Sequence, residues 1–225
     1  MSTTESLSIQ VIPIMHATAI VQWENTAIYI DPTGGAEVFE GKPPADIVLV
    51  TDIHGDHLSV ETLNAVVGEA ELIAPQAVKD QLPENIASRV RVLANGETMS
   101  LGGFDILAMP MYNLPESADS RHAKGRGNGY IIARDGFRVY IAGDTAGTPE
   151  MRAAKDIDIA FVPMNLPYTM GVEEAADAVL DFKPRTVYPY HYRGPDGLAD
   201  VAKFKALVNA GNPGIEVILA NWYPQ

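Results

Sequence analysis

Residues 51–57 bring together side chains that are typical metal ligands. The segment reads Thr-Asp-Ile-His-Gly-Asp-His, which places Asp52, His54, Asp56 and His57 within six residues. Oxygen and nitrogen donors at this density favour a site for Zn²⁺ or a similar divalent ion. On an extended backbone Asp52 and His54 share one face, whereas Asp56 and His57 point apart, as suits two separate ions. The alternative is a polar loop in which Asp56 caps a helix.

Three more candidate ligands lie in the second half of the chain, each beside an expected strand. His122 precedes one strand, and Asp144 and His191 each follow one. The chain contains only five histidines, and a lone histidine at a strand end is more often structural than a ligand. Here, four of the five histidines lie at strand ends and have aspartates beside them. This pattern favours a shared metal site, because imidazole and carboxylate groups are common metal ligands.

The strands expected around these ligands place them where substrates bind in α/β proteins. The apolar run 46–51 predicts a buried strand that leads into the cluster, and Ser59 is expected to cap the helix that follows. Strands 128–134 and 137–142 are expected to form a hairpin with an Asp-Gly turn, and strand 185–190 ends beside His191. Ligands at the carboxyl ends of such strands lie in the usual binding crevice.

The order of the elements indicates two similar halves. Each half begins with a run of strands and continues with alternating strands and helices, which fits two sheets packed face to face with helices outside. No long linker or low-complexity tract divides the chain, so residues 1–225 are expected to form a single domain. The other expected strands are 8–14, 18–23, 26–31, 71–74, 89–93, 97–101, 103–111, 157–162 and 214–219, and the other expected helices are 76–82, 172–182 and 197–209.

Composition limits the classes of partner and compartment. With 16 Lys and Arg against 29 Asp and Glu, the net charge is −13, which argues against nucleic acid or an anionic membrane as partner. The absence of cysteine excludes disulfides, thiolate metal sites and cysteine nucleophiles. The N-terminus lacks the basic and apolar regions of a signal peptide, which predicts a cytoplasmic chain, or a periplasmic one if it is a processed form. A small-molecule substrate is expected, and a homo-oligomer is left open.

The ordered motifs resemble those of the metallo-β-lactamase-fold hydrolase superfamily. Its signature is His-x-His-x-Asp-His after a strand, followed by a His, a Gly-Asp and a last His. The chain is most similar to the small, single-domain, UlaG-like branch, from the Ile-Tyr-Ile-Asp-Pro strand end at 28–32 to the Trp-Tyr-Pro at 222–224. The resemblance implies an α/β fold, namely a four-layer αββα sandwich of two mixed β-sheets with helices on both outer faces.

The resemblance also implies a dinuclear metal site at one edge of the sandwich. Two divalent ions are expected, with Zn²⁺ first and Mn or Fe as alternatives. The implied ligands are His54 and His122 for one ion, Asp56, His57 and His191 for the second, and Asp144 as the bridge.

Asp52 departs from the family pattern, because a histidine usually stands at this position. A carboxylate can also bind Zn²⁺, Mn²⁺ or Fe, so we expect Asp52 to be a true ligand. With Asp56, Asp144 and a bridging hydroxide, two divalent ions would keep one positive charge, and Asp52 makes the site neutral. A neutral site polarises a substrate oxygen less strongly than a site with one positive charge, and it also attracts an anionic substrate less strongly. The added oxygen ligand also favours harder ions such as Mn or Fe.

The expected chemistry is hydrolysis of a small ester, lactone, amide or phosphodiester. A metal-bound hydroxide would attack the electrophilic atom while the ions stabilise the oxyanion. Asp56 would be the catalytic residue that orients this nucleophile. Two alternatives stay open: a metal-binding sensor or non-catalytic module, which Asp52 supports, and a nuclease, against which the acidic balance counts.

Three residues are expected to contact the substrate: His16, Tyr168 and Arg121. His16 matches a recurring segment of the family branch, and its alternative role is that of a core histidine. Arg121 belongs to a basic cluster with Lys124 and Arg126 that could receive a carboxylate or phosphate, or could simply be solvated.

Asp31 is a further candidate near the site. It ends the expected strand 26–31 and precedes a proline, as is frequent in the family. There it would either support the metal loop from behind or form a turn.

Overall fold

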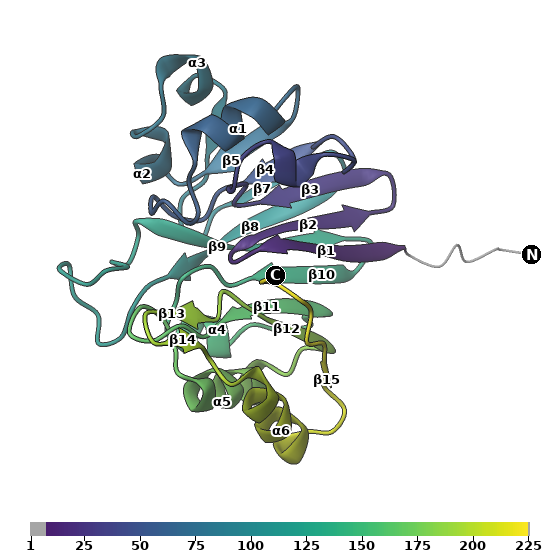
Figure 1. Ribbon diagram of the computed structural model, residues 1–225, viewed down its shortest axis with the longest axis vertical. Helices are drawn as coiled ribbons and strands as arrows, with labels where there is room; N and C mark the ends of the chain where they lie inside the picture. The colour runs from purple at the N-terminus through teal and green to yellow at the C-terminus, as the bar shows by residue number, and fades with distance from the viewer. Residues whose placement is uncertain (1–7, 225) are drawn as a thin grey trace, which may run out of the picture.

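The computed structural model describes residues 8–224, whose strands form two sheets packed face to face (Figure 1). The N-terminal sheet has the order β1-β2-β3-β4-β5-β6, with antiparallel pairing among the first three strands and parallel pairing from β3 onward. Its strands are β1 (Ile9–Met15), β2 (Thr18–Trp23), β3 (Thr26–Ile30), β4 (Ile47–Leu49), β5 (Glu71–Ala74) and β6 (Val90–Val92).

The C-terminal sheet repeats this mixed arrangement in the order β15-β12-β11-β10-β9-β8-β7. Pairing is antiparallel from β7 to β10 and parallel from β10 to β15. Its strands are β7 (Thr98–Leu101), β8 (Phe104–Met111), β9 (Gly127–Arg134), β10 (Phe137–Ile141), β11 (Ile159–Pro163), β12 (Thr186–Tyr190) and β15 (Glu216–Val217), and a separate small hairpin consists of β13 (Arg193–Gly194) and β14 (Gly197–Leu198).

Helices cover both outer faces, as Figure 1 shows. The first set lies against the N-terminal sheet and consists of η1 (Glu37–Phe39), α1 (Val60–Val66), α2 (Gln76–Lys79) and α3 (Glu84–Ala87); the second lies against the C-terminal sheet and consists of α4 (Pro149–Arg152), α5 (Val172–Phe182) and α6 (Val201–Gly211). The predicted αββα sandwich of two mixed sheets is therefore confirmed. Within residues 8–224, no helix is both long and apolar enough to cross a membrane.

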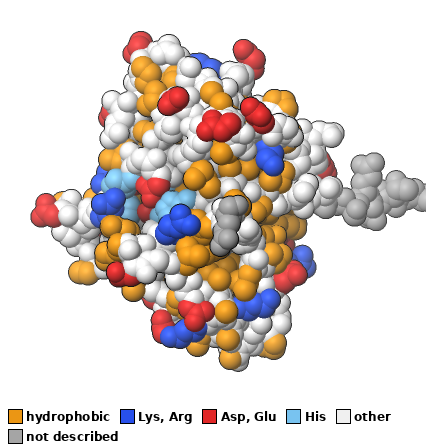
Figure 2. All heavy atoms as spheres, viewed as in Figure 1, with side chains coloured by type: hydrophobic (Ala, Val, Ile, Leu, Met, Phe, Trp, Pro, Cys, Tyr) orange, Lys and Arg blue, Asp and Glu red, His pale blue; other side chains and the backbone are white. Residues whose placement is uncertain are grey.

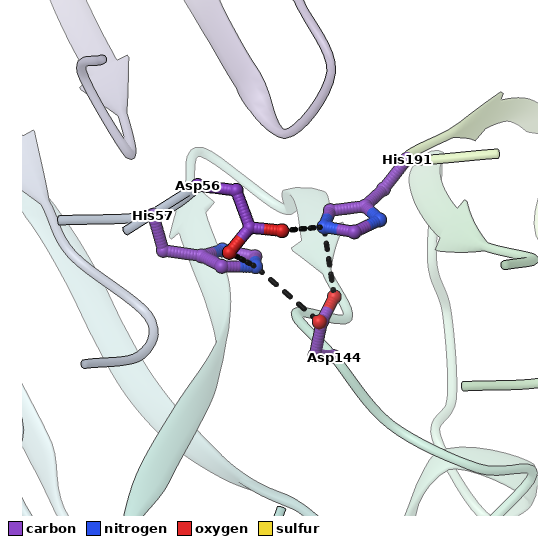
Figure 3. Close-up of side chains that lie close together, drawn as sticks. All are labelled: Asp56, His57, Asp144 and His191. Carbon is purple, nitrogen blue, oxygen red and sulfur yellow. Dashed lines mark ion pairs between the residues drawn. The ribbon is translucent and has the colours of Figure 1, made fainter. Parts of the chain in front are cut away.

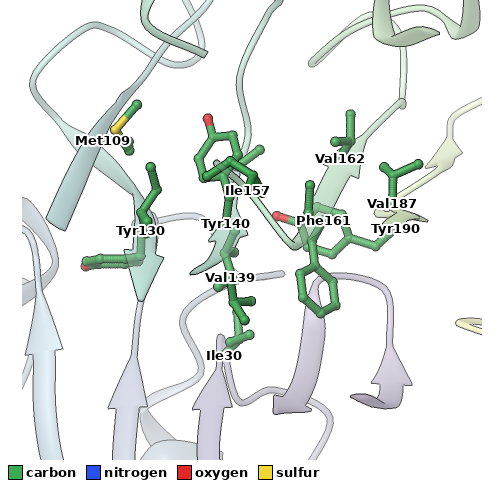
Figure 4. Close-up of a cluster of buried hydrophobic side chains, with 14 of the residues drawn as sticks. Ile30, Met109, Tyr130, Val139, Tyr140, Ile157, Phe161, Val162, Val187 and Tyr190 are labelled. Atoms are coloured by element: carbon green, nitrogen blue, oxygen red, sulfur yellow. The ribbon is translucent and has the colours of Figure 1, made fainter. Parts of the chain in front are cut away.

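Apolar side chains alternate along the strands and fill the layers between sheets and helices. In β2, Val21 and Trp23 belong to the main cluster, while Ile20 belongs to a second cluster beneath the N-terminal helices. Figure 4 shows part of the main cluster, in which Phe161 and Tyr190 are fully buried. This packed interior holds the strand ends, and with them the loops of one edge, in fixed positions.

Two expected element boundaries were wrong near the site edge. The helix expected at 197–209 begins only at Val201, because Asp200 caps it by accepting a hydrogen bond from the Lys203 amide, 2.8 Å away. The residues before Asp200 instead form β13 and β14. The strand expected at 46–51 ends at Leu49. The chain therefore leaves the sheet two residues earlier than expected.

Candidate metal centre

Four loops, which follow β4, β8, β10 and β12, carry the seven candidate ligands. The ligands form two groups, within each of which one donor atom per residue lies within 4.8 Å of the others. The Asp52 group consists of Asp52, His54 and His122, and the His57 group consists of Asp56, His57, Asp144 and His191. Each group takes residues from loops of both sheets, so it exists only when the two sheets are packed together.

In the His57 group, the imidazoles and carboxylates face one another (Figure 3). The Nε2 atoms of His57 and His191 each lie 3.4 Å from a different oxygen of Asp144. The second contact of His191 Nε2 is Asp56 Oδ2, at 3.2 Å. Four donor side chains therefore point toward a common centre.

The Asp52 group lies next to Asp144 of the His57 group. His54 Nδ1 contacts Asp52 Oδ2, and His122 Nε2 lies 3.7 Å from the same oxygen. His122 Nε2 is also 3.2 Å from Asp144 Oδ2. Asp144 thus contacts histidines of both groups.

The donor atoms of this centre fit metal ions because they are buried and lack other partners. Among residues 8–224, buried atoms without a hydrogen-bond partner include Asp52 Oδ1 and Oδ2, His57 Nε2, His122 Nε2 and Asp144 Oδ1. A buried polar atom without a partner costs free energy. Coordination by a cation supplies the partner that these oxygen and nitrogen atoms lack, and their types suit Zn²⁺, Mn²⁺ or Fe.

Neighbouring charges keep the carboxylates ionised. Burial raises the pKa of Asp144, but the charges of His191 and His57 outweigh it and hold that pKa well below its ordinary value. Burial also raises the pKa of Asp56, and hydrogen bonds from His16 and His191 lower it by more. Both side chains are therefore carboxylates at neutral pH, the form that binds cations.

Asp31 supports His57 from the side opposite the cluster. Its Oδ2 lies 2.8 Å from His57 Nδ1 and accepts a 2.6 Å hydrogen bond from the Thr51 hydroxyl. Its Oδ1 accepts from the Thr51 amide at 2.7 Å. When His57 Nδ1–H donates a hydrogen bond to the Asp31 carboxylate, the Nε2 atom of His57 is left free to bind a metal ion. Of the two roles expected for Asp31, support of the metal loop matches these contacts.

Asp31→Asn is expected to weaken metal binding by about 10- to 100-fold. The new amide nitrogen would present a donor to His57 Nδ1, which would favour the tautomer with the proton on Nε2. Competition of the protein with a metal-sensitive dye measures the change. The control is Asp46→Asn, which alters a carboxylate that accepts from the Ala27 amide, away from the cluster. Equal metal affinity in Asp31→Asn and Asp46→Asn would contradict a role for Asp31 in metal binding.

His57 makes metal binding dependent on pH. Burial lowers its pKa, but the neighbouring carboxylates Asp144 and Asp31 outweigh burial and raise that pKa well above the ordinary value. In the metal-free protein His57 therefore keeps both ring protons at neutral pH, and a metal ion must displace one. We expect affinity to fall as the pH is lowered, by up to about tenfold per pH unit for each proton displaced. Calorimetric zinc titrations in buffers of different ionisation enthalpy count the released protons, and a count of zero would contradict this prediction.

His16 lies beside the His57 group and contacts Asp56. Its Nε2 is 3.3 Å from Asp56 Oδ2, and its Nδ1 is 2.7 Å from the Tyr223 hydroxyl. The Tyr223 oxygen accepts hydrogen bonds from the amides of Tyr192 and Arg193, each at 3.0 Å. Because both acceptor positions are then used, Tyr223 donates its proton to His16 Nδ1. His16 consequently carries its own proton on Nε2 and donates it to Asp56.

The other two expected substrate residues also line the cavity over the metal centre. This cavity has a volume of about 310 Å³, and its walls include His16, Asp56, Asp144, Arg121 and Tyr168. The structure therefore brings His16, Tyr168 and Arg121 together beside the candidate ligands. Tyr168 also contributes its carbonyl oxygen, 3.1 Å from His122 Nδ1, and so helps to orient that ring.

The expected basic cluster around His122 does not form as a unit. Lys124 pairs with Glu150 at 2.8 Å and lies over the ring of Tyr112. Arg126 Nε instead lies 3.5 Å from Asp52 Oδ1. Of the three basic residues, only Arg121 lines the cavity.

Tyr223, Asn113 and Arg193 were not among the expected site residues. Asn113 Oδ1 lies 3.2 Å from His122 Nδ1, and Arg193 lines the cavity. Asn113 and Arg193 both fall near predicted ligand-bearing loops, but their positions in the sequence did not assign them a role. Tyr223 is 207 residues from His16 along the chain, so no local pattern indicates their contact.

Comparison with known families identifies this arrangement. The family model described as the beta-lactamase superfamily domain matches residues 11–191, which include all seven candidate ligands. The chain belongs to the beta-lactamase superfamily. The resemblance inferred from the sequence motifs is thereby confirmed.

Relatives within this superfamily cover most of the chain. A UPF0173 metal-dependent hydrolase of Pyrococcus abyssi is 34% identical over 191 residues, which are 80% of this chain and 84% of the relative. A solved structure from Parabacteroides distasonis, described as a candidate metal-dependent hydrolase, has a TM-score of 0.83 and 38% identity, and the match covers 97% and 95% of the two chains. The Igni18 metallo hydrolase of Ignicoccus hospitalis, at 24% identity, shares the fold with a TM-score of 0.79, and the match covers 94% of each chain.

Proposed function

We propose that this beta-lactamase superfamily protein hydrolyses a small ester, lactone, amide or phosphodiester with two divalent metal ions, Zn²⁺ first among them. The position of Asp144, in contact with histidines of both ligand groups, carries the proposal. The relatives named as metal-dependent hydrolases confirm the prediction of an enzyme at that general level. The substrate class, the number of ions and their identity belong to the proposal.

Metal ions bound here would lower the pKa of a coordinated water molecule and polarise the substrate oxygen. The side chains of the protein would orient the attacking water molecule. Asp56 is the exposed member of the His57 group, with 39% of its side chain accessible, and it faces the cavity. Because its pKa is lowered, the Asp56 carboxylate can accept a hydrogen bond from the attacking water.

His16 and Tyr223 hold Asp56 in place. The hydrogen bond from His16 Nε2 holds Asp56 Oδ2, so Asp56 Oδ1 remains available to a metal ion or to the water molecule. Tyr223 fixes the tautomer of His16 and thus the direction of this bond. The Asp31 carboxylate orients His57 in the same way, and the Asn113 side-chain oxygen and the Tyr168 backbone carbonyl orient His122.

Metal quantification combined with a substrate panel tests the proposal. The panel contains a lactone, a thioester, a phosphodiester and a β-lactam. We expect about two ions per chain and hydrolysis of one class, with activity lost after chelation and restored when metal is added back. Full metal loading without hydrolysis of any substrate would overturn the proposal in favour of a metal-binding sensor.

A further inference from the structure

The cavity over the metal centre has an arginine at each side, and each guanidinium is held by an aromatic ring. Arg121 comes from the loop between β8 and β9, and its Cζ lies 4.6 Å from the ring centre of Tyr168. Arg193 follows β12, and its Cζ lies 4.2 Å from the ring centre of Tyr223. Stacking on a ring restrains a long side chain, so less freedom is lost when a ligand binds.

Both arginines line the same cavity as the candidate ligands. On this face of the molecule, Figure 2 shows Lys or Arg side chains on either side of a small group of His and acidic side chains. Arg193 also lines a neighbouring cavity of about 340 Å³, whose walls include Met15, Gly34 and Tyr223. A ligand above the metal centre would therefore lie within reach of one or both guanidinium groups.

Neither arginine is neutralised by the protein. Within residues 8–224, Arg121 and Arg193 make no ion pair, although acidic residues greatly outnumber basic ones in this chain. Arg91, Arg134, Arg152 and other arginines do pair with carboxylates. Arg89 and Arg138 likewise make no ion pair in the described part of the chain, but of these four arginines only Arg121 and Arg193 line the cavity over the metal centre. Guanidinium groups bind carboxylates and phosphates through bidentate hydrogen bonds.

The cavity arginines also change the charge balance that Asp52 creates. Asp52 adds a negative charge to the centre, and Arg126 lies against it. The side chain of Arg126 donates to the backbone oxygen of Arg121, which ties the cavity arginine to the same loop. Arg126 therefore offsets Asp52, while Arg121 and Arg193 remain available to a ligand.

We propose that Arg121 and Arg193 form an anion subsite, so the substrate is a small organic molecule that carries a carboxylate or phosphate beside the bond to be hydrolysed. This proposal rests on the proposed hydrolase function and narrows its substrate class. Because Arg126 already pairs with Asp52, Arg121 and Arg193 are the basic side chains of this cavity that remain free to attract an anion.

Binding of product-like anions to the metal-loaded full-length protein tests the subsite directly. The probes are succinate, phenyl phosphate and the neutral butyramide, measured by calorimetry. Arg193→Gln and Arg121→Gln are each expected to weaken binding of the favoured anion by about tenfold or more. The control is Arg185→Gln, because Arg185 is 80% exposed, pairs with Asp158 and lies in a different cavity.

Comparison of the two anions shows whether the substrate carries a carboxylate or a phosphate. Tighter binding of succinate identifies a carboxylate substrate, and tighter binding of phenyl phosphate identifies a phosphate substrate. Anion binding that is unchanged in both cavity variants would overturn the subsite, because the metal ions alone would then hold the anion.

Hydrolysis of paired esters separates this proposal from the proposed function. Mono-4-nitrophenyl succinate and 4-nitrophenyl butyrate share a leaving group and differ in the distal carboxylate. If both are cleaved, Arg193→Gln should lower the ratio of their kcat/KM values, anionic over neutral, by about tenfold or more. Cleavage with an unchanged ratio contradicts a carboxylate subsite and leaves the hydrolase intact. If no ester is cleaved, calorimetry still decides on the subsite.

Discussion

Asp144→Asn is expected to reduce the metal content to one ion or less per chain and to lower hydrolysis by about a hundredfold or more. Asp144 contacts His57 and His191 of its own group and His122 of the Asp52 group, so it connects the two groups. Asparagine keeps the shape of the side chain but loses the charge and one of the two acceptor oxygens. Two cations held close together then lack the anion between them.

Elemental analysis and circular dichroism on the same sample check this prediction. The control is Asp177→Asn, which alters an exposed carboxylate that pairs with Arg152 outside the site. Asp177→Asn should keep metal and activity. Two ions in folded Asp144→Asn protein would contradict the bridging position.

Asp52→His, which restores the usual family residue, is expected to weaken metal binding by the Asp52 group by about two orders of magnitude. Asp52 is completely buried, which raises its pKa, but His54, His57 and Arg126 together lower that pKa by more, so it lies below its ordinary value. Arg126 Nε lies 3.5 Å from its Oδ1. An imidazole here is larger and neutral, and it would leave Arg126 beside the metal ion without its carboxylate.

The double variant Asp52→His with Arg126→Gln provides the matched comparison. Removal of the unpaired cation should recover part of the lost affinity, and a double-mutant cycle measures the coupling between the two positions. A rise in both metal content and activity in Asp52→His alone would contradict this prediction. The native site would then be a weakened form of the family site.

Most of the fold could be predicted because its signals are local. The alternation along β2 and the apolar run that contains β4 reflect which faces are buried. The four-residue helices α3 and α4 were not expected, since so short a segment shows no helical period. The start of α6 was misplaced because the β13–β14 hairpin forms through pairing of only four residues.

The candidate site was predictable where its residues lie in a motif or at a strand end. The ligands of segment 51–57 met both conditions. The contacts of Tyr223 depend on tertiary packing, which no residue pattern near it encodes. The same holds for the backbone of His16, Asp31 and His191, which adopt φ values of 48°, 44° and 47°. Left-handed conformations are uncommon for residues other than glycine, although Asp and His adopt them more often than most, and here the tertiary surroundings hold them in place.

Each ligand group joins loops of the N-terminal sheet to loops of the C-terminal sheet. Ions held there would act as cross-links between segments that are far apart in the sequence. If the ions stayed bound to the denatured chain, they would lower its entropy. If they are released on unfolding, they stabilise the folded state by mass action. In a chain that has no cysteine, the same ions that serve catalysis would take the place of disulfides. Unlike disulfides, these cross-links would open as the pH falls.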